Sequence, residues 1–236
     1  MAKDKQKGKK SPGSEILENP EVLAESLSRT EQFFEKNKLG LIYAASLVVV
    51  LVSGFFLFRT YMSNQNRNAQ NDMFQAVFYF EADSLDRALN GDGNNYGFLD
   101  IIREYRWTES ANLAHFYAGV SLLKKGEYIS AIDHLEKFKS ADLVVQARAY
   151  ALIGDAHMEM QDYGAAARMY ERAAAHKPNE QISPEYLQKA ALAYELLEDY
   201  KSAYACYDAI VQKYVNSSLI QEARKHRARL EQLKAS

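Results

Sequence analysis

The 236-residue sequence has one cysteine, four prolines and one tryptophan. The single cysteine, Cys206, excludes an intrachain disulfide framework and a metal site built from several cysteines. Scarce proline, together with frequent alanine, leucine, tyrosine and glutamate, favours an all-helical fold. The formal net charge is only −2, so no global field favours binding to nucleic acid.

Catalytic motifs are missing as well. The five histidines are scattered, none belongs to a His-Glu-x-x-His pattern, and no glycine-rich phosphate loop is present. His115 and His157 fall at expected packing positions, where an interior histidine is the simplest interpretation. Cys206 has no assigned base partner, which indicates an inert thiol. We therefore expect no enzyme, no cofactor, no metal and no small-molecule substrate.

The first 37 residues predict two segments. Residues 1–19 are rich in lysine and contain Pro12 and Gly13, which is typical of a disordered basic tail; a nucleic-acid-binding arm is the alternative. Asn19 and Pro20 form a helix start, so residues 20–37 are expected to form a short amphipathic helix. Its polar face carries four glutamates, which favours a protein contact or a surface-lying helix over anionic lipid. These are Glu21, Glu25, Glu31 and Glu35.

The longest apolar run, Leu39–Phe58, has 20 residues without a charge. A helix of that length spans the roughly 30 Å hydrocarbon core of a bilayer. We therefore predict a transmembrane helix over residues 38–60, with aromatic residues gathered at its second end. The alternatives are a buried helix of a soluble protein and a cleaved signal peptide, for which the run is too long and begins too late.

Basic residues predict the orientation of this span. Residues 1–38 contain eight Lys and Arg, whereas residues 59–78 contain two. Such a bias places the N-terminus in the cytoplasm and the large C-terminal part across the membrane. In a bacterium this is a single-pass inner-membrane protein with a periplasmic domain.

Residues 61–236 are predicted to form one helical domain. The polar, then apolar stretch over residues 60–90 predicts one helix, and 97–105 predicts a second, so that together they form a hairpin sealing the N-terminal end. The segment Asn90–Asn95 between them superficially suggests a calcium loop. It has Asn95 at the sixth position and Ile101 at the twelfth, where calcium loops require Gly and Glu, so a plain turn is expected.

Three helix-turn-helix units follow, near residues 112–145, 147–180 and 184–217. Tyrosines recur in the turns and small residues recur in the second helices, both at steps of 35 and 37. The positions are Tyr128, Tyr163 and Tyr200, and Ala131, Ala166 and Ala203. The size pattern over residues 147–180 resembles the tetratricopeptide repeat (TPR). This resemblance implies an α-solenoid of about three repeats, because a single helix pair cannot bury its apolar face alone.

A TPR solenoid lines its concave face with the second, fifth, ninth and twelfth residues of each first helix. The resemblance therefore implies a protein-binding groove, apolar at its N-terminal end and mixed in charge beyond, that suits polypeptides with hydrophobic anchors. Carried over, the lining is Leu113, Phe116, Val120 and Leu123, then Arg148, Ala151, Asp155 and Met158, then Glu185, Gln188, Leu192 and Glu195. Alternatively, the repeats pack against the protein's own end helices and leave no open groove.

Residues 219–233 predict a last helix with one basic side. Terminal repeats need a polar outer face, so this helix is expected to be a solvated cap, with a site for an acidic partner as the second interpretation. The basic side chains are Arg224, Lys225, Arg227 and Arg229.

Taken as a whole, residues 30–236 resemble the YfgM-like family of ancillary subunits of the bacterial SecYEG translocon. The resemblance rests on the paired-Phe segment Glu31–Phe34, the single span, the Asn- and Gln-rich helix after it, and the segment Asn112–Phe138. It implies a periplasmic TPR scaffold at the translocon exit, with SecYEG, a PpiD-like chaperone and unfolded clients as partners. The residue patterns also allow a structural adaptor in another envelope complex (secretion, motility or division), or an organellar TPR receptor facing the cytosol.

Overall fold

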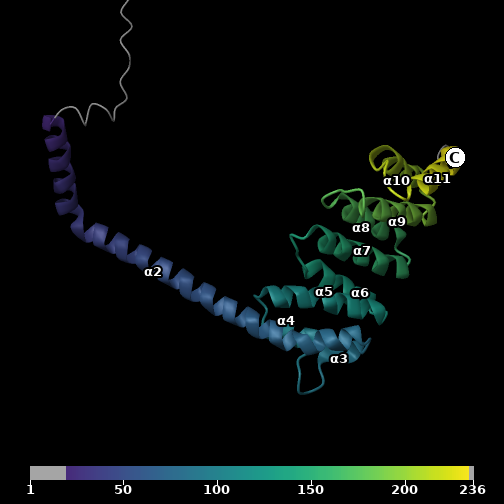
Figure 1. The fold of residues 1–236 in the computed structure, drawn as a ribbon, viewed down its shortest axis with the longest axis horizontal. Coiled ribbons are helices and arrows are strands. Elements are labelled where there is room, and N and C mark those ends of the chain that lie inside the picture. The colour runs from purple at the N-terminus through teal and green to yellow at the C-terminus, as the bar shows by residue number, and fades with distance from the viewer. Residues whose placement is uncertain (1–19, 234–236) are drawn as a thin grey trace, which may run out of the picture. The chain divides into compact units, whose positions relative to one another are not determined.

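The computed structural model describes residues 20–233, which contain ten helices and no strand (Figure 1). The predicted all-α fold is confirmed, whereas the predicted basic tail, residues 1–19, lies outside the described residues. The helices are α2 (Pro20–Glu81), α3 (Leu85–Asn90), α4 (Phe98–Glu104), α5 (Glu109–Lys124), α6 (Tyr128–Lys137), α7 (Leu143–Glu159), α8 (Tyr163–Ala175), α9 (Ser183–Leu196), α10 (Tyr200–Lys213) and α11 (Ile220–Leu233).

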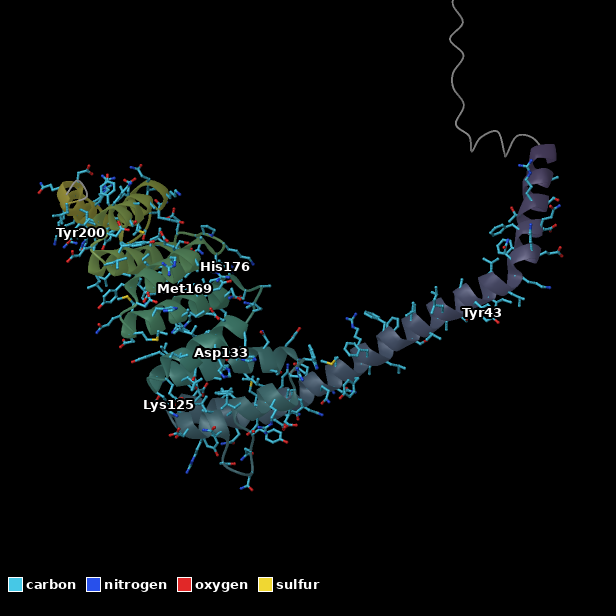
Figure 2. The ribbon with its side chains drawn as sticks, turned by 180° about the vertical axis from the view of Figure 1, so that it is seen from behind. Tyr43, Lys125, Asp133, Met169, His176 and Tyr200 are labelled. Carbon is cyan, nitrogen blue, oxygen red and sulfur yellow. The ribbon has the colours of Figure 1, made fainter. Side chains whose placement is uncertain are left out.

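The chain divides into two compact units, residues 1–60 and 61–236. In the first unit, the described residues all belong to α2. This helix contains an apolar stretch that is long enough to cross a membrane by length and composition, and none of that stretch is buried by protein. Tyr43, for example, is 73 % exposed (Figure 2).

The prediction that a separate short helix ends near Asn37 is wrong, because α2 continues through this position to Glu81. Asn37 does not cap a helix end. Its side-chain amide donates to the Phe33 carbonyl at 2.9 Å, one turn earlier in the same helix. No proline interrupts residues 38–81, so the backbone hydrogen bonds continue into the apolar run.

In the second unit, helices follow one another in chain order as a stack of antiparallel pairs (Figures 1 and 2). The turn inside each pair repeats one geometry. The second residue after the first helix adopts positive φ, and the amide of the next residue donates to the carbonyl five residues back along the chain, as in a Schellman motif. The left-handed residues are Gly126 (φ 80°), Gln161 (61°) and Glu198 (61°). The corresponding bonds are Glu127 N to Leu122 O, Asp162 N to His157 O and Asp199 N to Tyr194 O.

The same turn corrects the helix predicted through residue 90. Asp83 has φ 54°, and the Ser84 amide donates to the Tyr79 carbonyl at 2.8 Å, so α2 ends at Glu81 and the chain restarts as α3. Short polar side chains tolerate this left-handed conformation. The expected hairpin at the N-terminal end is therefore present, and its buried side chains include Met73, Leu89 and Phe98.

Small residues stand where the paired helices cross. Ala131, Ala166 and Ala203 are all fully buried. A Cβ atom on Gly119 would lie 2.6 Å from Leu135 Cγ, and one on Gly154 would lie 2.7 Å from Tyr170 Cε1. The helices therefore approach closely because these positions carry little or no side chain, and larger neighbours fill the remaining space.

The last helix, α11, covers the C-terminal end of the stack through the buried side chains Ala223 and Leu230. Its basic side is partly committed to the fold, because Arg227 Nη1 lies 2.8 Å from Asp208 Oδ1 and Arg229 pairs with Glu195. Ser217 precedes this helix, and its hydroxyl accepts from the Leu219 amide at 3.2 Å.

The crossing of α7 and α8 predicts opposite effects for two glycine substitutions. Gly154→Ala should destabilise the protein by about 1–3 kcal/mol, because the buried Tyr170 ring, anchored through its hydroxyl, cannot move aside. Gly164→Ala, with only ordinary contacts at 3.6 Å and beyond, should stabilise it by about 0.4–1 kcal/mol. Urea unfolding of the full chain in detergent measures both, and equal effects would contradict the close-approach argument.

Candidate protein-binding site

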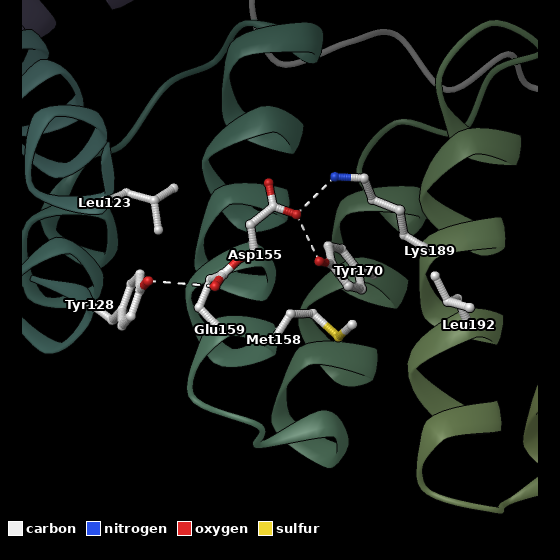
Figure 3. A pocket seen from close by; sticks show the side chains of 8 residues that line it. All are labelled: Leu123, Tyr128, Asp155, Met158, Glu159, Tyr170, Lys189 and Leu192. Atoms are coloured by element: carbon white, nitrogen blue, oxygen red, sulfur yellow. Dashed lines mark hydrogen bonds and ion pairs between the residues drawn. The ribbon is translucent and has the colours of Figure 1, made fainter. Parts of the chain in front are cut away.

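A hollow of about 550 Å³ opens on one face of the helix stack. Each helix from α5 to α9 contributes to it, so the hollow exists only because consecutive pairs stack (Figure 3). Its lining residues are Leu123 from α5, Tyr128 from α6, Asp155, Met158 and Glu159 from α7, Tyr170 from α8, and Lys189 and Leu192 from α9.

Asp155 is the polar centre of the hollow (Figure 3). Its Oδ1 atom accepts from the Tyr170 hydroxyl at 2.7 Å and lies 2.8 Å from Lys189 Nζ. Burial and the Asp155 hydrogen bond both raise the pKa of Tyr170, so its hydroxyl stays a donor. The ammonium of Lys189 also lies 5.3 Å from the centroid of the Tyr170 ring. Asp155 therefore links α7 to both α8 and α9, and its charge is compensated locally.

Apolar side chains flank this polar centre (Figure 3). Leu123 lies on one side and Leu192 on the other, with Met158 between them; Leu192 is 52 % exposed. The Tyr128 hydroxyl makes a long contact, 3.5 Å, with the Oε2 atom of Glu159. The hollow can therefore bury apolar side chains of a partner while its rim hydrogen-bonds polar groups, a composition typical of polypeptide recognition.

The structure brings together some of the residues expected in the groove. Leu123, Asp155, Met158 and Leu192 line the hollow. Leu113 packs against the core near Phe98, while Phe116 and Val120 pack against the core around Leu135. These three side chains are partly buried and do not line the hollow. Arg148 and Glu185 are exposed outside the hollow, Gln188 is half-buried and Ala151 is buried.

The carboxylate of Glu195 interacts with side chains of the same protein. It pairs with Arg229, and its Oε1 atom lies 3.9 Å from Nδ1 of His226, both on α11. The last helix, α11, therefore contacts the residue that was predicted to lie at the C-terminal end of the groove.

Four lining residues were not anticipated from the sequence: Tyr128, Glu159, Tyr170 and Lys189. Tyr128 and Tyr170 belong to second helices and occupy positions that the repeat pattern assigns to packing between helices. Lys189 follows Gln188 directly, and its reach across to Asp155 depends on the stacking of α9 on α7 and α8. Tyr170 is buried, and only its polar hydroxyl, which needs a partner when buried, could have suggested that it reaches the hollow.

Two other kinds of side chain could carry chemistry: the Cys206 thiol and the groups that ligate metal ions. Cys206 is 4 % exposed, and burial, followed by the nearby Glu171 carboxylate, raises the pKa of its thiol to about 12. Such a thiol is a poor nucleophile at neutral pH. Within residues 20–233, no three His, Cys, Asp or Glu side chains converge as a metal site would require.

The first repeat contains a histidine pair between α5 and α6. Nδ1 of His115 lies 3.1 Å from Nδ1 of His134, a distance at which one neutral ring donates to the other. Burial, followed by repulsion from His134 and Lys137, lowers the pKa of His115 to about 4. Burial lowers the pKa of His134 as well, opposed by Asp133. The pair is a packing contact between helices and lies outside the hollow.

Comparison with known proteins agrees with this architecture. Residues 147–180 match the sequence model of the tetratricopeptide repeat. A comparison with curated proteins gave no match. The match coincides with α7 and α8, and the pairs α5–α6 and α9–α10 have the same turn geometry. The helical domain is therefore a TPR α-solenoid with an N-terminal hairpin and a C-terminal capping helix. TPR domains generally bind other proteins and are not themselves enzymes.

The histidine pair predicts an acid-sensitive fold. Because the folded pKa of His115 lies below its ordinary value of 6.5, the unfolded chain binds more protons between about pH 6.5 and 4. The contribution of His115 to stability is therefore full above pH 6.5 and is lost as the pH falls toward 4. His115→Gln should show a smaller fall in urea midpoint over this range than the wild type. Identical pH profiles would contradict this assignment.

Proposed function

We propose that the protein is a membrane-anchored TPR scaffold that binds other polypeptides through the hollow between α5 and α9. The single observation that carries the proposal is the composition of that hollow. It offers apolar anchors from three helices around a self-compensated Asp155–Lys189 pair. A partner can bury apolar side chains beside this pair, because each of its two charges already has a partner.

The unburied apolar stretch of α2 supports the anchor. The core helix of a soluble protein is mostly covered by its neighbours, whereas Val50 and Leu57 are 66 % and 72 % exposed. Side chains of this kind are stable in a hydrocarbon environment and costly in water. A membrane-spanning helix explains both the length of this apolar stretch and the exposure of its side chains.

The finer proposal places the solenoid in the bacterial periplasm beside the SecYEG translocon. It rests on the resemblance of residues 30–236 to the YfgM-like family and on the basic residues that precede the span. The role is passive: the anchor raises the local concentration of the solenoid near the channel, and the hollow holds or hands over newly translocated polypeptides. A PpiD-like chaperone would be a neighbouring partner.

The hollow predicts a specific loss of polypeptide binding in Leu192→Asp. Burying one leucine contributes about 1.5–3 kcal/mol, so binding should weaken about ten- to hundredfold. Fluorescence anisotropy of a labelled, reduced and carboxymethylated model protein with the full chain in nanodiscs measures this. The matched control is Ile129→Asp, because Ile129 is 78 % exposed but lies outside the hollow. Equal losses in both variants would indicate nonspecific adhesion.

The proposed topology predicts opposite labelling on the two sides of the span. Cys206 is buried, so the native chain should react little with a membrane-impermeant maleimide. In spheroplasts of a Gram-negative host, Ser130→Cys should be labelled at once, and Ser28→Cys only after permeabilisation, because both serines are exposed. The reverse pattern would contradict a periplasmic solenoid.

Copurification in the same cells after gentle detergent extraction separates the finer proposal from its rivals. Recovery of SecY would support the translocon assignment. Recovery of another envelope complex without SecY would reject that assignment while leaving the anchored scaffold in place.

A further inference from the structure

A second hollow, of about 470 Å³, lies at the N-terminal end of the second unit and shares no residue with the TPR hollow. The end of α2 forms one wall, and the loop between α3 and α4, with Tyr105 after α4, forms the other. Its lining is mostly polar. The residues are Asn71, Asp72, Phe74 and Gln75 from α2, Asn94, Asn95 and Tyr96 from the loop, and Tyr105.

The loop that forms this wall is held in one conformation. Both carboxylate oxygens of Asp92 are used: Oδ1 accepts from the amides of Asn94 (2.9 Å) and Asn95 (2.7 Å), and Oδ2 accepts from the Tyr79 hydroxyl at 2.6 Å. These bonds hold the pKa of Asp92 well below its usual range, so it accepts at any physiological pH.

Two glycines allow backbone segments at the two ends of this loop to approach each other closely. A Cβ on Gly97 would lie 2.3 Å from the Leu89 carbonyl oxygen, and Gly91 adopts φ 77°, a region that favours glycine. Asn94, Asn95 and Tyr96 are thus presented by a pre-organised surface loop, the kind of element that commonly carries binding sites.

Some side chains that line the hollow have hydrogen-bond donors and acceptors that the fold does not use. Within residues 20–233, the side-chain amides of Asn71 and Asn94 bond to no other residue. Asp72 accepts from the Tyr105 hydroxyl at 2.5 Å through Oδ2, which leaves Oδ1 available. Each carboxamide offers both donors and an acceptor. The hollow can therefore satisfy a ligand whose groups donate and accept at closely spaced positions.

Exposed aromatic rings border these amides. Phe74 is 74 % exposed and Tyr96 is 42 % exposed. Such rings offer a flat apolar face to the C–H side of a ligand. No Lys, Arg or His lines the hollow among residues 20–233, and Asp72 contributes a negative charge. Phosphate, carboxylate and nucleic-acid ligands are therefore disfavoured.

We infer that this hollow binds a neutral saccharide. The donors and acceptors of its carboxamides match the hydroxyl groups of a sugar, and the exposed rings match the C–H faces of the sugar rings. A polypeptide partner would cover the exposed phenylalanines Phe74 and Phe78 together, whereas a saccharide in the hollow meets Phe74 alone, because Phe78 does not line it. The solenoid would then carry two sites of different chemistry, one for polypeptide and one for sugar.

Titration of the full chain with oligosaccharides tests this inference. The chain is placed in phospholipid nanodiscs, since detergents with sugar headgroups would compete. The probes are the tetrasaccharides of β-linked glucose, α-linked glucose and β-linked N-acetylglucosamine, each followed by saturation-transfer NMR. At least one should bind with Kd on the order of 1 mM, as expected for a small open site. Phe74→Ala and Asn71→Ala should each weaken that binding at least fivefold.

Phe78→Ala is the matched control, because Phe78 is exposed one turn further along α2 but outside the hollow. It should leave saccharide binding unchanged, and circular dichroism should show all three variants folded. The absence of binding for every probe at 10 mM, tenfold above the expected Kd, would overturn the inference. So would equal losses in Phe74→Ala and Phe78→Ala, or capture of a protein partner that both substitutions abolish, since these outcomes assign the face to a protein contact.

Discussion

The close approach of paired helices is the constraint on which the second unit depends. Gly119 and Gly154 leave no space for a Cβ atom, because Leu135 and Tyr170 already occupy it. Alanines at the matching positions of the second helices are fully buried. A helix pair of this length cannot bury its apolar face unaided, so each pair is stable only against its neighbours. The stack, and the hollow formed along it, follow from these small residues.

The same tyrosine serves both packing and the hollow. Tyr170 fills the space over Gly154, and its hydroxyl reaches Asp155, which also meets Lys189 on the next repeat. The polar centre of the hollow is therefore held by a residue that the core requires. A rigid, self-compensated centre lets the flanking Leu123, Met158 and Leu192 act as apolar contacts without reorganisation.

The two ends of the stack differ in their surfaces. At the C-terminal end, α11 presents arginines, two of which pair with Asp208 and Glu195. This is the polar outer face that terminal repeats need for solubility. At the N-terminal end, α2 presents exposed Phe74 and Phe78 beside an amide-lined hollow. Solubility does not require such a surface, which is why the N-terminal end is assigned a ligand.

Local patterns in the sequence determined the helical class, the apolar run, the repeat period and the positions of the small residues, because helix periodicity and side-chain size act over a few residues. Only the tertiary structure decided which side chains meet. It brought Tyr128, Tyr170 and Lys189 into the hollow, and it engaged Glu195 through pairing with Arg229. These outcomes depend on contacts between helices up to 34 residues apart in the chain, and no local pattern encodes the stacking that produces them.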